Sequence, residues 1–429
     1  MKTTKQLAPE NRESHPAPTP DAQRRAFLMR TPGIAAAALA VPAAAAEEIV
    51  AAPKWMQTPG TPMRAYGTPA RFEEKTLRTV TPSYGPVAPT VGTSRTPLQL
   101  LEGTITPAGL HFERHHNGVP EIDPAQHRLM IHGLVQRPLV YSVDMLLRYP
   151  MVSRICFIEC AGNSSANTLP KSAQTTAGAI HGLLSISEWT GVPLSVLLEE
   201  AGIAPHADWL LAEGSDAVAM SRSVPLAKAL DDAIVALYQN GERLRPEQGY
   251  PMRLLLPGWE GNMNVKWLRR LKLTRGPTHT KDETSKYSDM LHDGTALQFT
   301  FEQGVKSLIT RPSVGMKMPE PGWTEITGLA WSGAGRIRRV EVSTDGGVSW
   351  RDAALQGPVL ARSATRFRLS WAWNGSRALL QSRATDERGA VQPTRAAWQA
   401  RYSPEMRYHN NMIQTWEIAA NGSVSNVYL

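Results

Sequence analysis

Residues 154–163 read RICFIECAGN, seven mostly apolar or β-branched residues followed by a turn. This composition predicts a buried strand that ends at Cys160. Gly162 and Asn163 are turn residues, so the chain is expected to bend sharply directly after the cysteine. A strand end of this kind holds a side chain rigidly and exposes backbone N–H groups beside it, which makes Cys160 a candidate metal ligand.

The segments around this strand alternate between helical and extended patterns. Strands are predicted at 127–133, 208–213, 233–238 and 252–256, and helices at 142–148, 185–189, 193–201 and 225–230. Ser142 is a suitable cap for the first of these helices, and Gly202 for the end of the third. The mixture predicts an α+β domain at about 91–316.

The pattern changes after Arg311-Pro312. From 325 to 398 the chain has short alternating runs, and Asp345-Gly346-Gly347 joins two of them as a hairpin would. Short alternating strands with such turns are typical of an all-β sandwich, so an immunoglobulin-like domain is expected at 317–429.

Composition excludes some partners. The chain has 429 residues, 42% hydrophobic content and a net charge of +8. No block of Lys and Arg suggests nucleic acid, although a moderately basic surface favours an acidic partner protein. Two domains and a tail suit this length.

The N-terminal segment resembles an export signal. Arg24-Arg25 precede Phe27-Leu28, and an Ala-rich apolar run follows at 34–46. Residues 1–46 are therefore expected to be a twin-arginine signal peptide, which implies a periplasmic protein that folds before export. The alternative is a membrane anchor, but the apolar run is short of the ~20 residues that a span needs. Residues 47–90, rich in Pro, Gly and Thr, are expected to form an extended arm.

The chain has two cysteines, Cys156 and Cys160. On one strand a four-residue offset places them ~13 Å apart, too far for a disulfide. Motifs for nucleotides, zinc proteases and attached haem are absent. His115-His116 would point to opposite faces of a strand, which is poor zinc geometry.

Several segments in order resemble the sulfite oxidase family. Cys160-Ala-Gly-Asn163 is similar to its molybdenum-binding core, and the stretches 112–120 and 234–268 are similar to its cofactor-binding segments. The alternating C-terminal region is similar to its dimerisation domain. The resemblance covers roughly 98–420, and it implies a molybdenum-molybdopterin cofactor whose metal bonds to the Cys160 thiolate. Cys156 is interpreted as a buried structural cysteine.

The resemblance also assigns further site residues. Those implied to contact the cofactor are Phe112, Arg114, His116, Asp216, Gln248, Arg253, Asn264, Val265 and Lys266. Gln248 stands where the family often has histidine. Those implied to act on the substrate are Arg114, Tyr287 and, by a weaker alignment, Arg401.

One departure from the family indicates the substrate. Sulfite oxidases carry arginine directly after Cys-Ala-Gly-Asn, whereas this chain has Ser164-Ser165. Less positive charge suits a sulfur carried on another protein better than a small free dianion. With Tyr287 and the 408–412 tail, this resembles the molybdenum subunits of bacterial Sox thiosulfate oxidation, the sulfane dehydrogenases.

That resemblance implies oxygen-atom transfer to sulfur, and it implies that the electrons pass to a separate c-type, dihaem cytochrome subunit. It also implies a homodimer within a hetero-oligomer, no nucleic-acid partner and no stable membrane anchor. The alternatives are a sulfite dehydrogenase acting on free sulfite and a non-catalytic assembly subunit. A methionine-sulfoxide reductase is disfavoured by the extra sandwich domain.

Overall fold

The structure, a computed structural model, describes residues 54–83, 88 and 90–429. The predicted signal segment at 1–46 lies outside these residues. The chain divides into two units, Met1–Pro69 and Ala70–Leu429. In the first, the described residues form one short 3-10 helix, η2 (Lys54–Met56). Within the described ranges, no helix is long and apolar enough to cross a membrane.

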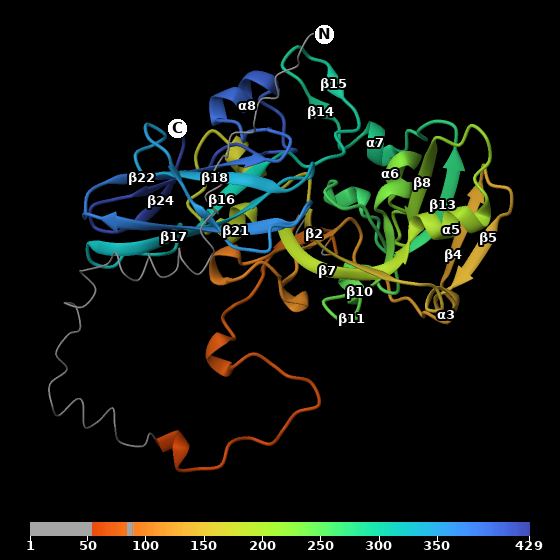
Figure 1. The fold of residues 1–429 in the computed structure, drawn as a ribbon, viewed down its shortest axis with the longest axis horizontal. Coiled ribbons are helices and arrows are strands. Elements are labelled where there is room, and N and C mark those ends of the chain that lie inside the picture. Colours follow the sequence, from red (N-terminus) through yellow and green to blue (C-terminus); the bar gives the residue numbers. More distant parts are fainter. Residues whose placement is uncertain (1–53, 84–87, 89) are drawn as a thin grey trace, which may run out of the picture. The chain divides into compact units, whose positions relative to one another are not determined.

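A five-stranded sheet forms one side of the predicted α+β domain. Its order is β5-β4-β13-β8-β9, and all neighbours are antiparallel except β13 and β4. The strands are β4 (Arg128–Gly133), β5 (Leu139–Ser142), β8 (Trp209–Gly214), β9 (Ser221–Pro225) and β13 (Leu268–Thr274). Three helices share its apolar core: α3 (Val143–Leu146), α5 (Leu194–Ala201) and α6 (Leu226–Asp231). Figure 1 shows these helices beside the sheet.

Helix ends follow the predicted caps. The Ser142 side chain accepts a hydrogen bond from the Met145 N–H at 3.2 Å, which caps α3. Gly202 ends α5 with φ of 70°, the left-handed conformation that glycine adopts without strain.

A second sheet carries the cysteines. Its order is β11-β10-β7-β6, and β12 also pairs with β10. The strands are β6 (Val152–Glu159), β7 (Leu184–Pro193), β10 (Ile234–Gln239), β11 (Glu242–Arg243) and β12 (Arg253–Leu255). The helix predicted at 185–189 is wrong, because these residues lie inside β7. Sheet pairing on both sides of β7 outweighs a weak local helical pattern.

Short elements complete this part of the chain. A three-stranded sheet has the order β1-β2-β3, and β14 and β15 form a hairpin. The strands are β1 (Thr79–Pro82), β2 (Gly92–Arg95), β3 (Glu113–His115), β14 (Asp289–Met290) and β15 (Ala296–Leu297). The helices are η3 (Arg71–Glu73), η5 (Leu98–Leu100), η6 (Ala108–Leu110), η7 (Ser165–Thr168), α4 (Ala177–His181), η8 (Pro246–Gln248), η9 (Gly261–Met263) and α7 (Lys281–Thr284).

The C-terminal region is the predicted β-sandwich. One sheet has the order β16-β17-β21-β20, and the other β19-β18-β22-β23-β24 (Figure 1). The elements are β16 (Lys306–Arg311), β17 (Gly322–Trp331), β18 (Ile337–Ser343), β19 (Arg351–Asp352), β20 (Ala354–Leu355), β21 (Ala364–Trp373), β22 (Ala378–Asp386), α8 (Arg395–Arg401), β23 (Thr415–Ile418) and β24 (Val424–Val427). β18 and β19 pair as the predicted hairpin. β16 precedes residue 317, so the sandwich begins earlier in the chain than predicted.

The sandwich and the cysteine-bearing sheet share one hydrophobic core. Phe157 of β6 and Ile186 of β7 belong to the same buried cluster as Leu308 and Phe367 of the sandwich. The strand that presents Cys160 is therefore packed against the C-terminal domain. The fold class, an α+β domain followed by an all-β domain, is confirmed.

Candidate functional site

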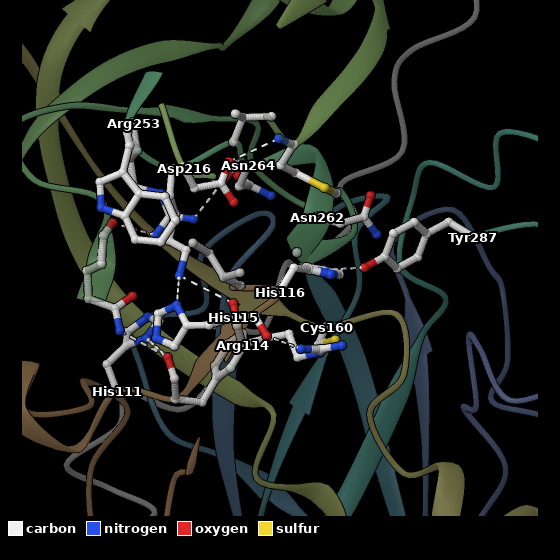
Figure 2. A pocket seen from close by; sticks show the side chains of 18 residues that line it. His111, Arg114, His115, His116, Cys160, Asp216, Arg253, Asn262, Asn264 and Tyr287 are labelled. Carbon is white, nitrogen blue, oxygen red and sulfur yellow. Dashed lines mark hydrogen bonds between the residues drawn. The ribbon is translucent and has the colours of Figure 1, made fainter. Parts of the chain in front are cut away.

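A pocket opens where β6 ends, and segments far apart in the sequence line it. It encloses roughly 690 Å³, including its open mouth, which suits a medium-sized ligand. The residues that line it come from 111–116, 158–160, 216–220, 248–253 and 261–267, with Tyr287. Figure 2 shows Cys160, Arg114 and His116 between an end with Tyr287 and an end with Arg253.

The Cys160 thiol lines this pocket at the turn predicted from the sequence. The Cys160 N–H donates to the Leu183 carbonyl at 3.0 Å, which continues the ladder with β7. Asn163 then holds the turn, because its Oδ1 accepts from the Leu183 N–H at 3.1 Å and its Nδ2 donates to Glu159 at 2.9 Å. Burial raises the pKa of the thiol, while the Gly162 N–H and the Arg114 charge lower it in part.

Ser164 follows the Cys-Ala-Gly-Asn turn, where sulfite oxidases carry arginine, but its side chain does not face the pocket. Its backbone has φ of 65°, and its side chain is buried against His181 Nδ1 at 2.6 Å and Lys306 Nζ at 2.8 Å. Lys306 belongs to β16 of the sandwich and also pairs with Glu159 at 3.0 Å. The Lys306 charge beside this turn is therefore neutralised inside the protein.

Tyr287 and His116 form a hydrogen-bonded pair near Cys160. The Tyr287 hydroxyl lies 3.0 Å from His116 Nε2. Burial, followed by the Arg114 charge, lowers the pKa of His116 to about 4, so the ring is neutral at pH 7. Burial also raises the pKa of Tyr287. The hydroxyl and the neutral imidazole therefore share one hydrogen bond, and the ring nitrogen of His116 that carries the proton determines which group donates.

Asn262 is a pocket residue that the sequence interpretation missed. Its Oδ1 accepts from Arg222, and its Nδ2 donates to Glu260 at 2.7 Å. Arg222 and Glu260 form a fully buried ion pair at 3.1 Å. A buried charge pair therefore fixes the orientation of a neutral carboxamide in the wall of the pocket, and no local sequence pattern predicts it.

The other end of the pocket collects cationic groups. Arg253 is 3% exposed and lies over the Trp189 ring at 4.9 Å. Burial lowers the pKa of Arg253 to about 9, and burial and the Arg253 charge lower that of Lys266 to about 7. Lys266 Nζ donates to backbone oxygens and lies 3.0 Å from His115 Nδ1. An anionic ligand at this end would favour the protonated form of both groups.

The remaining predicted cofactor residues also line this pocket, but the polar side chains of some of them form hydrogen bonds to the protein backbone. Asp216 Oδ1 accepts from the Met220 N–H at 3.0 Å. Gln248 Nε2 donates to the Phe112 carbonyl at 3.0 Å. The Asn264 side chain accepts from the Leu256 N–H at 2.7 Å and donates to two carbonyls, so it braces the loop. Phe112 and Val265 are buried in the wall.

Arg401 is the exception among the predicted residues. It ends α8, its side chain is exposed, and it does not line the pocket. Its guanidinium lies 5.2 Å from the Tyr402 ring centroid instead. The structure gives no support to a contact with substrate, since the helix end directs Arg401 to solvent.

Comparison with known proteins decides the family. The oxidoreductase molybdopterin binding domain matches 116–281, and the Mo-co oxidoreductase dimerisation domain matches 298–416. A crystal structure of the sulfane dehydrogenase SoxCD from Paracoccus pantotrophus is 45% identical, with a TM-score of 0.86, covering 89% of this chain and 98% of that chain. The chain belongs to the sulfite oxidase family of molybdopterin oxidoreductases.

More distant members are also similar. Mitochondrial sulfite oxidase of Mus musculus is 32% identical over 65% of this chain and 53% of its own length. NADH nitrate reductase of Ulva prolifera is 30% identical over 64% of this chain and 35% of its own length. The chain thus spans about half the length, or less, of these curated relatives.

The pocket fits the molybdenum cofactor that family membership implies. Cys160 offers a soft sulfur ligand at one position, and within the described residues no group of three His, Cys, Asp or Glu side chains offers a competing metal site. Arg253 Nε and His111 Nε2 are buried without partners in the same wall. Unpaired buried polar atoms of this kind suit a bound polar ligand.

Proposed function

We propose that this chain is the molybdenum subunit of a periplasmic sulfane dehydrogenase. It oxidises sulfur carried on a partner protein and passes electrons to a c-type, dihaem cytochrome subunit. Similarity to the solved SoxCD sulfane dehydrogenase supports this assignment, and the match to a dimerisation domain supports a homodimer within the complex. The twin-arginine pattern at Arg24-Arg25 supports export.

The observation that carries the substrate proposal is the low charge around Cys160. Of the residues labelled near it in Figure 2, Arg114 is the cation, while His116, Asn262 and Tyr287 are uncharged at pH 7. Ser164 stands where sulfite oxidases carry arginine, and its side chain is buried. A small dianion needs more positive charge than this, whereas a sulfane sulfur attached to a carrier needs less.

Each residue near Cys160 has a distinct role in the proposal. When bound, the molybdenum cofactor supplies two-electron oxygen-atom transfer. Cys160 would hold the metal, and Arg114 would stabilise negative charge on oxygens bound to the sulfur. His116, protonated on Nε2, would donate to the Tyr287 oxygen, which leaves the Tyr287 proton free to point toward the substrate. Asn262 offers a neutral polar group. Arg253 and Lys266 would hold the phosphate and amide groups of the pterin.

Steady-state kinetics on purified mature protein with its cytochrome partner test this function. Carrier-bound sulfane sulfur and free sulfite are compared as substrates, with cytochrome reduction as the signal. We expect kcat/KM for the carrier-bound substrate to exceed that for sulfite by at least about tenfold, a difference of ~1.4 kcal/mol in transition-state binding. A preference for free sulfite would assign the chain as a sulfite dehydrogenase. A protein without molybdenum and pterin would be the assembly subunit.

A further inference from the structure

His111 is a buried imidazole in the pocket wall, outside the residues that the family resemblance selects. It lies between η6 and β3 and is 1% exposed. Figure 2 shows it at the end of the pocket that holds Arg253, away from Tyr287. Both nitrogens of a ring this deeply buried are expected to form hydrogen bonds, because an unpaired buried polar atom is costly.

Packing fixes the ring on three sides. It stacks on Phe112 with centroids 5.3 Å apart and an interplanar angle of 19°. It meets the Trp189 ring edge-on, with centroids 5.6 Å apart. Its Nδ1 lies 3.0 Å from the Phe112 carbonyl oxygen. The imidazole therefore has one orientation available before any ligand binds.

The contact with Phe112 determines which ring nitrogen carries the proton. A carbonyl oxygen can only accept, so Nδ1 must be the N–H donor. Burial and the charges of Arg253 and Lys266 lower the pKa of His111 to about 3, so the ring stays neutral. Nε2 is then a bare acceptor. It is buried and has no hydrogen-bond partner among the residues that the structure describes.

Gln248 does not satisfy this acceptor. Its Nε2 donates to the same Phe112 carbonyl at 3.0 Å, so its amide N–H group faces the backbone. Arg253 Nε, the other unpartnered polar atom in this wall, is a donor. The wall thus presents one free acceptor and one free donor, both buried.

We propose that His111 Nε2 accepts a hydrogen bond from a ring N–H or amino group of the pterin, which makes His111 a cofactor-holding residue. Pterins carry such donors beside acceptor oxygen and nitrogen atoms, which matches the free acceptor of His111 and the free donor of Arg253. The assignment rests on the proposed function in one respect, namely that this pocket holds the pterin.

Three substitutions separate hydrogen bonding from packing. H111F keeps the ring stacked on Phe112 but loses Nε2, H111Q places an acceptor oxygen near the Nε2 position, and H111N places polar atoms near Nδ1 only. Molybdenum and pterin per chain, and the half-time of pterin release after dilution, are measured on each purified protein. The melting temperature of each apoprotein reports packing.

We expect H111F and H111N to release pterin about tenfold faster than the wild type, which is the effect of losing one buried hydrogen bond. H111Q should stay within about threefold of the wild type. H111F retention equal to the wild type would overturn the assignment. Equal losses in all three variants, with lowered apoprotein melting temperatures, would show a packing role and also overturn it. A wild-type protein that contains no pterin would instead refute the proposed function, and this assignment with it.

Discussion

One asparagine fixes the direction in which Cys160 faces. Asn163 uses both ends of its carboxamide, accepting from the Leu183 N–H and donating to Glu159, so the turn after β6 has little freedom. The sequence predicted this turn from Gly162 and Asn163 because turn chemistry is local. It did not predict His111 or Asn262, since their roles depend on Trp189, Arg222 and other residues far along the chain.

The ligand assignment makes a direct prediction. Cys160→Ser should abolish molybdenum-dependent activity and reduce bound molybdenum by at least tenfold, because a neutral hydroxyl replaces a soft thiolate. Molybdenum analysis and sulfur-oxidation assays check this, and export of the folded chain should be unchanged. Cys156→Ala is the matched control. That cysteine is buried inside β6 and away from the pocket lining, so the variant should keep its molybdenum.

A second prediction concerns pH. Burial lowers the pKa of His181 to about 3 from 6.5 in the unfolded chain. Between these values the unfolded chain binds a proton that the folded chain does not, so stability should fall as the pH decreases from about 6.5 towards 3. The contribution is about 1.4 kcal/mol per pH unit.

Urea unfolding of the apoprotein at pH 7 and pH 5 measures this effect. His181→Gln should lose less stability over that interval than the wild type, whereas substitution of the exposed His292 with glutamine should leave the difference unchanged. An identical pH dependence in wild type and His181→Gln would contradict the prediction.

At the scale of elements, β7 is what holds the cysteine-bearing strand in place. It pairs with β6 along one side and with β10 along the other. The local sequence pattern predicted most strands of this sheet, but it wrongly predicted a helix at 185–189. Ser185 and Ser187 are fully buried there, and serine carries almost no signal for a buried strand. The long-range pairing that decides the outcome is not visible in a short window of sequence.

Gly191 is the point at which β7 and β10 approach closely. A Cβ at this position would lie 2.1 Å from the Val235 carbonyl oxygen and 2.6 Å from the Ala236 Cα, both backbone atoms. Gly191→Ala should therefore destabilise the protein by about 2 kcal/mol or more. Gly276→Ala, where a Cβ meets nothing within 4 Å, should change stability by less than about 0.5 kcal/mol. Equal unfolding midpoints for the two variants would show that the strands can separate at no cost.

At the scale of the molecule, the sandwich supplies part of the framework behind Cys160. Lys306 of β16 forms a buried ion pair with Glu159, and Trp331 of β17 donates to the same carboxylate at 2.7 Å. The sequence predicted a sandwich, because alternation and the Asp345-Gly346-Gly347 turn are local signals. It placed the boundary after β16, since nothing local shows that 306–311 pairs with β17.

Breaking the Lys306–Glu159 pair should therefore be costly. Lys306→Met leaves Glu159 charged and buried without its cation, which we expect to reduce the free energy of unfolding by about 3–5 kcal/mol. The double variant Lys306→Met, Glu159→Gln removes both charges and should lose much less than the sum of the single losses. Chemical denaturation of the wild type, Lys306→Met, Glu159→Gln and the double variant checks this. Additive losses would mean that the two side chains do not interact.

One backbone contact determines when, during synthesis, the loop after Cys160 can be completed. The N–H of His409 donates to the carbonyl of Ala161 at 2.8 Å, so a residue from the far C-terminal region closes the loop that follows Cys160. His409 must therefore have been synthesised and have left the ribosome before this loop can be completed. Nascent chains halted earlier lack that brace on the loop that follows Cys160.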